Sequence, residues 1–131
     1  MLICGEKKTQ CTILRICVQI SITVFSSKDK ITIIPFDNEI LGTYTTNNGI
    51  DTKNLIDKIT GINIGGGTDI YKPAMKGLEI LSQEDLETYN VSIVLMTDGA
   101  SNYNRLDELT RLYKKTGKDI PIFSIMFGYA E

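Results

Sequence analysis

The apolar residues of this chain gather in short runs that alternate with amphipathic stretches. Three runs have the length and density of buried strands: Ile31–Ile34, Val91–Thr97 and Ile120–Phe127. The last is apolar at nearly every position, which is typical of a strand covered on both faces. Pro35 should close the first strand, because proline cannot donate to a strand ladder. Glu39–Thr46 alternates loosely and predicts an edge strand antiparallel to Ile31–Ile34.

Between the strands, apolar residues recur at the three- and four-residue spacings of helices. One helix should end at Gly61, and a second should begin no earlier than about Ile70, because Pro73 fits only in a first helical turn. A third should follow Asn104 and stop at Gly117. The residues expected to face inward are Leu55, Ile56 and Ile59 in the first helix, Ala74, Leu78 and Leu81 in the second, and Leu106, Leu109, Leu112 and Tyr113 in the third.

The longest apolar run, Thr12–Phe25, is rich in β-branched residues, and propensity alone favours a strand. Its length exceeds that of a usual strand, and Ile13, Cys17, Ile20 and Val24 satisfy a helical stripe, so we expect a buried helix. The alternation of helix and strand predicts a three-layer, Rossmann-like α/β fold, with a mostly parallel sheet flanked by helices. We expect a single domain over residues 1–131.

The strongest candidate for chemistry is a glycine-rich turn before the second of these helices. It reads Gly65-Gly66-Gly67-Thr68-Asp69, and the later buried strand ends in Thr97-Asp98-Gly99. Ligands of open α/β sheets bind at the carboxyl ends of the strands, so Thr68 and Asp98 should lie at the same edge. Glycines allow close backbone approach, while a hydroxyl and a carboxylate supply hard oxygen atoms. These groups suit either a magnesium-like cation or a phosphate, and Asp69 should cap the helix.

The same residues resemble the von Willebrand factor type A (VWA) domain. That family builds a metal-ion-dependent adhesion site (MIDAS) from an Asp-x-Ser-x-Ser loop, a threonine loop and an aspartate loop. By resemblance Thr68 is the threonine and Asp98 the aspartate, with Ser101, Asn102 and Asn104 at the rim. The resemblance implies a magnesium ion whose open coordination position takes an acidic side chain of a partner protein. No Asp-x-Ser-x-Ser occurs in the chain, so the match covers two loops of three.

The resemblance also implies a partial domain, truncated at both ends. The central first strand would lie before Met1, and the family continues beyond Glu131 with a further helix, strand and terminal helix. Loss of a central strand would leave its neighbours with unpaired edges, so we expect marginal folding or self-association through the sheet edges.

Composition excludes several other functions. Fourteen basic and sixteen acidic residues give a net charge of −2, which offers little attraction to nucleic acid or to an anionic membrane. Three cysteines and no histidine make a zinc site or a disulfide framework improbable. No signal peptide or transmembrane segment is apparent, and we expect a cytoplasmic location.

Three hypotheses about function follow from these observations. The leading one is a non-enzymatic protein-interaction module, because the chain has no histidine, no Gly-x-Ser-x-Gly and no Walker motif. The second is a phosphate-binding α/β enzyme or enzyme subunit that cradles an anion between Gly65 and Thr68, at a helix N-terminus. The third is a fragment without independent function.

Overall fold

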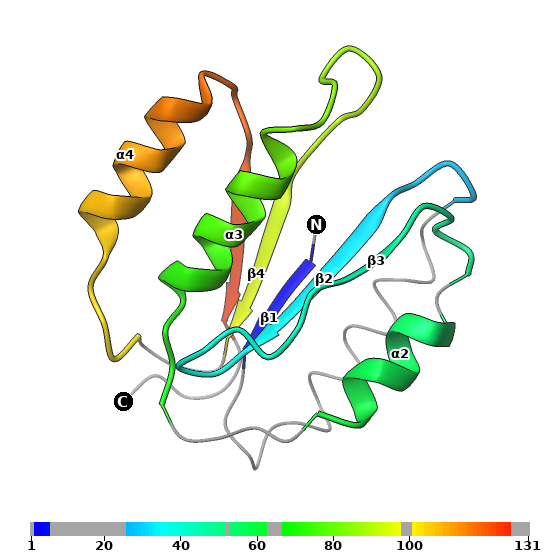
Figure 1. Ribbon diagram of the computed structural model, residues 1–131, viewed down its shortest axis with the longest axis horizontal. Helices are drawn as coiled ribbons and strands as arrows, with labels where there is room; N and C mark the ends of the chain where they lie inside the picture. Colours follow the sequence, from blue (N-terminus) through cyan, green and yellow to red (C-terminus); the bar gives the residue numbers. More distant parts are fainter. Residues whose placement is uncertain (1, 6–25, 52, 63–66, 98–100, 127–131) are drawn as a thin grey trace.

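The computed structural model describes residues 2–5, 26–51, 53–62, 67–97 and 101–126 (Figure 1). In chain order the elements are β1 (Leu2–Gly5), β2 (Ile31–Phe36), β3 (Tyr44–Thr46), α2 (Lys53–Thr60), α3 (Tyr71–Leu81), β4 (Ile93–Thr97), α4 (Leu106–Thr116) and β5 (Ile122–Met126). The strands form one sheet in the order β3-β2-β1-β4-β5. All neighbours are parallel except β3, which runs antiparallel to β2 as predicted.

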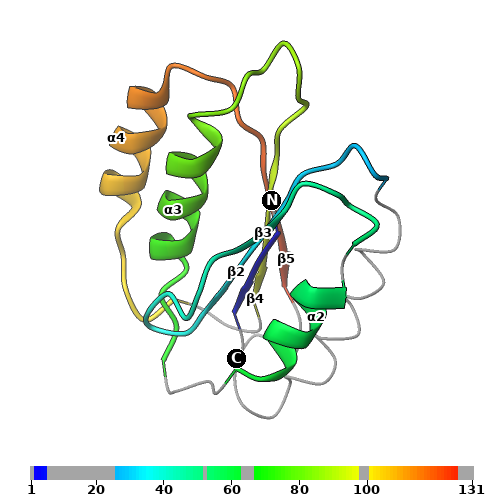
Figure 2. The same ribbon diagram turned by 45° about the vertical axis from the view of Figure 1, so that its right-hand side comes forward.

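Helices cover both faces of this sheet. Figure 2 shows the sheet close to edge-on, with α3 and α4 on one side and α2 on the other. This arrangement confirms the predicted three-layer α/β fold. The predicted helix over Thr12–Phe25 lies outside the described residues.

The centre of the sheet is occupied by β1, which pairs with β2 on one side and β4 on the other. The prediction that the central strand would lie before Met1 is therefore wrong. So is the prediction that the strands beside it would have unpaired edges. Sequence reading missed β1 because four residues carry too little periodicity to be recognised, while parallel pairing on both sides stabilises even a short strand.

Two apolar clusters hold the layers together, one on each face of the sheet. Alternate residues of β2 point to opposite faces, as strand geometry requires. Toward α2 the buried residues are Ile31, Ile33, Leu55 and Met96, joined by partly buried Ile56 and Ile59. Toward α3 and α4 they are Ile34, Phe36, Leu78, Leu81, Ile93, Leu95 and Ile120. Each buried side chain contributes about 1.5–3 kcal/mol, so within the described residues the α3 face supplies the larger share.

Strand β2 continues through Pro35 to Phe36, two residues beyond its predicted end. The carbonyl of Pro35 accepts the Leu41 N–H at 2.9 Å, on the side of β2 that faces β3. A strand residue directs its N–H and C=O toward the same neighbour, so the N–H that proline lacks would also face that side. The hydrogen bonds to β1 are unaffected, which explains why proline is tolerated here.

The predicted helix ends agree with the structure. Helix α3 begins at Tyr71, so Pro73 lies in its first turn, and Ala74, Leu78 and Leu81 are buried as expected. Helix α4 ends at Gly117, which adopts the left-handed conformation with φ +64°. Glycine occupies this conformation without the steric cost that other residues incur, which explains why the helix ends there.

Two predictions about burial are wrong, and both concern the β5 side of the molecule. Strand β5 lies at the edge of the sheet, and all five of its residues are exposed, so it is not covered on both faces. On α4, Leu109, Leu112 and Tyr113 pack against the α3-side cluster, but Leu106 is 56% exposed.

No helix within the described ranges is both long enough and apolar enough to span a membrane.

Candidate functional site

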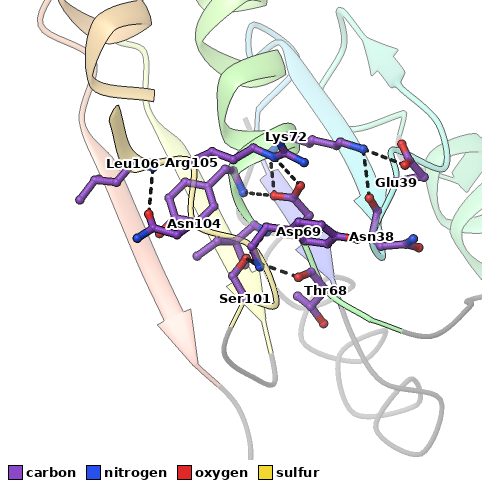
Figure 3. Close-up of polar contacts among 12 residues, drawn as sticks. Asn38, Glu39, Thr68, Asp69, Lys72, Ser101, Asn104, Arg105 and Leu106 are labelled. Carbon is purple, nitrogen blue, oxygen red and sulfur yellow. Dashed lines mark hydrogen bonds and ion pairs between the residues drawn. The ribbon is translucent and has the colours of Figure 1, made fainter. Parts of the chain in front are cut away.

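Three loops meet at the carboxyl ends of β2 and β4, and we call them the loop cluster. The first follows β2 (residues 37–39), the second precedes α3 (residues 67–70) and the third lies between β4 and α4 (residues 101–105). Figure 3 shows these loops converging from separate parts of the chain. This is the sheet edge where the sequence predicts ligand binding.

Thr68 and Asn102 join the second loop to the third by a reciprocal pair of hydrogen bonds. The Thr68 N–H donates to Asn102 Oδ1 at 2.7 Å, and the Asn102 N–H donates to the Thr68 carbonyl at 2.8 Å. Ser101 adds longer contacts, in which its hydroxyl donates to the Thr68 carbonyl and accepts the Ile70 N–H, both at 3.4 Å. The backbone of Thr68 is therefore fixed from the aspartate loop.

Asp69 connects the same two loops through a buried ion pair. Its side chain is fully buried, and Oδ2 accepts a hydrogen bond from Arg105 Nε at 3.0 Å. Oδ1 accepts the N–H groups of Tyr71 at 3.0 Å and Lys72 at 3.3 Å, which confirms that Asp69 caps α3. A buried carboxylate already occupies the N–H groups of Tyr71 and Lys72, and its negative charge disfavours a phosphate at the start of α3.

The loop after β2 closes the cluster from the other side. The Asp69 N–H donates to the Asp37 carbonyl at 2.9 Å, and Asp37 Oδ1 accepts the Glu39 N–H at 2.8 Å. Lys72 Nζ contacts Glu39 Oε1 at 2.7 Å and the Asn38 carbonyl at 3.3 Å. Main-chain bonds and ion pairs thus hold all three loops in one arrangement.

Gly67 has a backbone conformation that favours glycine at the point where the loops meet. Its φ is +87°, and a Cβ at this position would lie 3.4 Å from Asn102 Oδ1 and 3.5 Å from Asn38 Cβ. These are ordinary van der Waals distances, so the strain that an L-residue would meet comes from the positive φ rather than from a clash. The third glycine of the predicted turn therefore serves the meeting of the loops.

The predicted site residues divide into those that the structure describes and those that it does not. Gly67, Thr68 and Asp69 lie in the loop cluster, whereas Gly65, Gly66, Asp98 and Gly99 lie outside the described residues. Thr68 is 3% exposed, and its hydroxyl makes no hydrogen bond to any described residue. Figure 3 shows that hydroxyl directed away from Asp69 and Ser101. A buried hydroxyl without a partner has its oxygen available to a cation.

The described residues do not by themselves form a metal site. They contain no group of three or more Cys, Asp or Glu side chains placed to hold an ion. Thr68 fits a cation at one position, and Asp98 is the second oxygen donor that the sequence offers. Hydrated magnesium gains little from so few ligands.

Sequence reasoning missed Arg105 and underestimated Asn102 and Asp37. Asp37 directly follows buried β2, the same signal that identifies Asp98 after β4, although the sequence analysis named only Asp98. The resemblance places Asn102 only at the rim, and the structure gives it a direct contact with Thr68. Arg105 carried no signal, because its partner Asp69 lies 36 residues away.

Arg105 has a distinctive electrostatic environment. The hydrogen bond to Asp69 raises the pKa of Arg105 above its usual range, with a smaller contribution from the nearby Glu108 carboxylate. The guanidinium carbon also lies 5.1 Å from the centroid of the Tyr103 ring. The arginine is therefore permanently charged and held between an ion pair and an aromatic ring.

No protein-family model matches the chain, and no curated protein matches its sequence. Among solved structures, it matches proximal thread matrix protein 1 (PTMP1) from the mussel byssus, both in a structure with a zinc-occupied MIDAS motif (TM-score 0.69) and in a second crystal form (TM-score 0.70). Both are 15% identical to this chain and cover 98% of it, whereas the chain spans 38% of PTMP1. A likeness at this identity concerns the fold alone, and the fold of this chain is a VWA-like, Rossmann-like α/β fold.

Proposed function

We propose that this chain is a non-enzymatic protein-interaction module of the VWA type, which binds a carboxylate of a partner protein through a metal ion at a remnant MIDAS. The observation that carries the proposal is the buried Thr68 hydroxyl, which has no hydrogen-bond partner among the described residues and lies where three loops meet. The fold supports it, because VWA-like folds generally serve protein interaction.

Thr68 and Asp98 would hold the metal in this proposal. Thr68 would offer its hydroxyl oxygen directly, and Asp98 would act through water. The metal would supply a positive charge with an open coordination position for the partner carboxylate. Because the chain lacks an Asp-x-Ser-x-Ser loop, we expect magnesium affinity weaker than micromolar, on the order of millimolar.

The identity of the metal is a separate part of the proposal. The PTMP1 structure carries zinc in its MIDAS motif. The two oxygen donors named here favour magnesium or manganese, since zinc in proteins prefers nitrogen and sulfur ligands. We therefore propose magnesium, and separate titrations with magnesium and with zinc show which of these two metals binds more tightly.

The test is a fluorescence-anisotropy titration with a fluorescein-labelled peptide that carries one central glutamate. Binding should strengthen with 5–10 mM magnesium, a range set at about the expected dissociation constant, and should fall in EDTA to a weak level that does not depend on metal. Thr68→Ala should weaken the magnesium-dependent binding roughly tenfold or more. Thr110→Ala removes the same hydroxyl from an exposed position on α4 and should change nothing. Equal binding with EDTA and with magnesium would contradict the proposal.

Self-association is a second proposal, carried by β5. Ile122, Phe123, Ile125 and Met126 are between 38% and 60% exposed, on a strand whose only described neighbour is β4. The strand contains no charged residue and no proline, the two features that usually protect an edge. A second copy of the chain fits this edge, because an uncharged apolar strand is complementary to itself when two copies run antiparallel.

A further inference from the structure

The terminal nitrogens of Arg105 form a second feature that could take an acidic ligand, beside the metal-binding residues of the proposed function. Nε is used by Asp69 at 3.0 Å, and within the described chain the two terminal NH₂ groups have no hydrogen-bond or ion-pair partner. The Arg105 side chain is nevertheless 31% exposed, so part of the guanidinium group is open to solvent.

Arg105 is also held in a fixed position. The buried Asp69 carboxylate holds the Nε side, and the Tyr103 ring lies against the guanidinium group at 5.1 Å. A long side chain normally loses rotamer freedom when it binds an anion, and this loss offsets much of the gain. Here that freedom is already restricted, so an incoming carboxylate meets two pre-oriented donors in the geometry that suits it.

The surroundings of Arg105 identify the kind of partner. Tyr103 is 43% exposed and Leu106 is 56% exposed, so apolar surface lies on both sides of the cation along the chain. A groove of about 300 Å³ adjoins it, lined by Asn104, Arg105, Leu106, Asp107, Glu108 and Arg111. Of the two carboxylates in the groove, Glu108 interacts with Arg105 and would compete with an external anion.

We infer that Arg105 is a docking residue for a second carboxylate of the partner, so that the module recognises an acidic segment with an apolar residue rather than a single acidic side chain. This inference deepens the proposed function and rests on it for the identity of the site. The Arg105 contribution itself needs no metal, because the guanidinium group supplies the charge.

The experiment compares two fluorescein-labelled peptides, one with a single glutamate and one with two glutamates flanking a leucine. In EDTA and about 50 mM salt, the diacidic peptide should bind with a dissociation constant roughly three- to tenfold lower than that of the monoacidic peptide. The difference should shrink as salt rises toward about 0.5 M, because exposed charges are screened. Magnesium should strengthen the binding of both peptides, so the two contributions can be measured separately.

Variants assign the metal-independent part to Arg105. Arg105→Lys keeps a positive charge for Asp69 but lacks the paired donors, and it should remove the advantage of the diacidic peptide while the protein melts as the parent does. Arg111→Gln removes an arginine from the same groove and should leave most of that advantage. Glu108→Gln removes the competing carboxylate and should strengthen binding about two- to threefold.

Several outcomes would overturn the inference. It fails if the diacidic peptide shows no advantage in EDTA, if Arg105→Lys binds as the parent does, or if Arg111→Gln abolishes the advantage instead. Loss of magnesium dependence with the Arg105 effect intact would contradict the proposed function and leave the docking role of Arg105 supported.

Discussion

The loop cluster and the β5 edge differ in how many partners their side chains have. In the loop cluster, the buried charge of Asp69 has an arginine and two N–H groups as partners, and the backbone of Thr68 is bonded on both sides. At β5, four large apolar side chains are exposed, although they belong to a strand whose sequence is typical of a core. Loops, which are usually the mobile parts of a fold, are here tied together by polar contacts.

The difference shows where each region obtains its stability. The loop cluster depends on a few specific partners, so a change in one of them should alter stability and binding sharply. Strand β5 depends on the ladder to β4, with Ile93–Thr97 opposite Ile122–Met126, and its side chains contribute little. Changes there should alter association between molecules more than folding.

The largest expected effect comes from removing the cation that Asp69 requires. Arg105→Leu leaves a fully buried carboxylate without a counter-charge, and it should lower the free energy of unfolding by roughly 2–4 kcal/mol. Asp69→Asn keeps a capping oxygen and leaves Arg105 free to reach solvent, so it should cost only about 1 kcal/mol. Urea unfolding measures both variants. Equal costs would show that the ion pair does not stabilise the cluster in the way described.

Two glycines test whether the meeting of the loops imposes strain beyond that of the backbone. Gly67→Ala should destabilise by about 1–2 kcal/mol, because an L-residue is strained at its positive φ and the two loops in contact with the new Cβ limit how far the backbone can relax. Gly117→Ala has a similar φ but nothing within 4 Å, so it should cost about 1 kcal/mol. Thermal melts followed by circular dichroism measure the difference. A cost for Gly117→Ala as large as that for Gly67→Ala would show that the neighbouring loops add nothing to the backbone strain.

The β5 edge should respond to charge in its association and hardly at all in its stability. Phe123→Lys places a charge on the exposed strand and should shift a dimer toward monomer by about tenfold in dissociation constant, with a change in unfolding free energy within about 0.5 kcal/mol. Sedimentation velocity over a concentration series measures the first, and urea unfolding the second. A parent chain that is monomeric at all concentrations would rule out association through β5.

The smallest effect concerns Asp85, outside both regions. The hydrogen bond from the Thr88 hydroxyl, aided by the Glu87 N–H, lowers the pKa of Asp85 below 3.8. Because the pKa of Asp85 is lower in the folded chain than in the unfolded one, its ionised carboxylate stabilises the fold. This stabilisation is fully present above the unfolded pKa near 3.8 and is lost as the pH falls through the lower folded pKa. Titration of the Asp85 carboxyl by NMR should show a midpoint below that of Thr88→Ala. Identical Asp85 midpoints in the parent chain and in Thr88→Ala would show that the Thr88 hydrogen bond does not lower this pKa.

Local features of the fold could be predicted from sequence, while features that depend on distant residues could not. Pro73 and Gly117 fix helix ends through their own backbone preferences, so the start of α3 and both limits of α4 agree with the prediction within a residue or two. In contrast, β1 is defined by its neighbours, and an apolar pattern alone did not show that β5 would lie at an exposed edge.

The candidate site shows the same limit. Asp69 was predicted as a helix cap from its position before α3, and that interaction is local. The pairing of Asp69 with Arg105 and of Thr68 with Asn102 joins residues 36 and 34 positions apart. Such pairs form because the sheet brings its loops together, and no spacing in the sequence predicts them.

The most direct test of the account is where a paramagnetic metal binds. Manganese titrated into the isotopically labelled chain should broaden the amide signals of Thr68, Asp98 and Asn102 at millimolar concentration, the range expected for so sparse a site, because relaxation falls steeply with distance from the ion. Thr68→Ala should remove this broadening, and Gly117 at the far end of α4 should be unaffected in both proteins. Broadening confined to Asp107 and Glu108, with Thr68 unchanged, would contradict a metal site in the loop cluster.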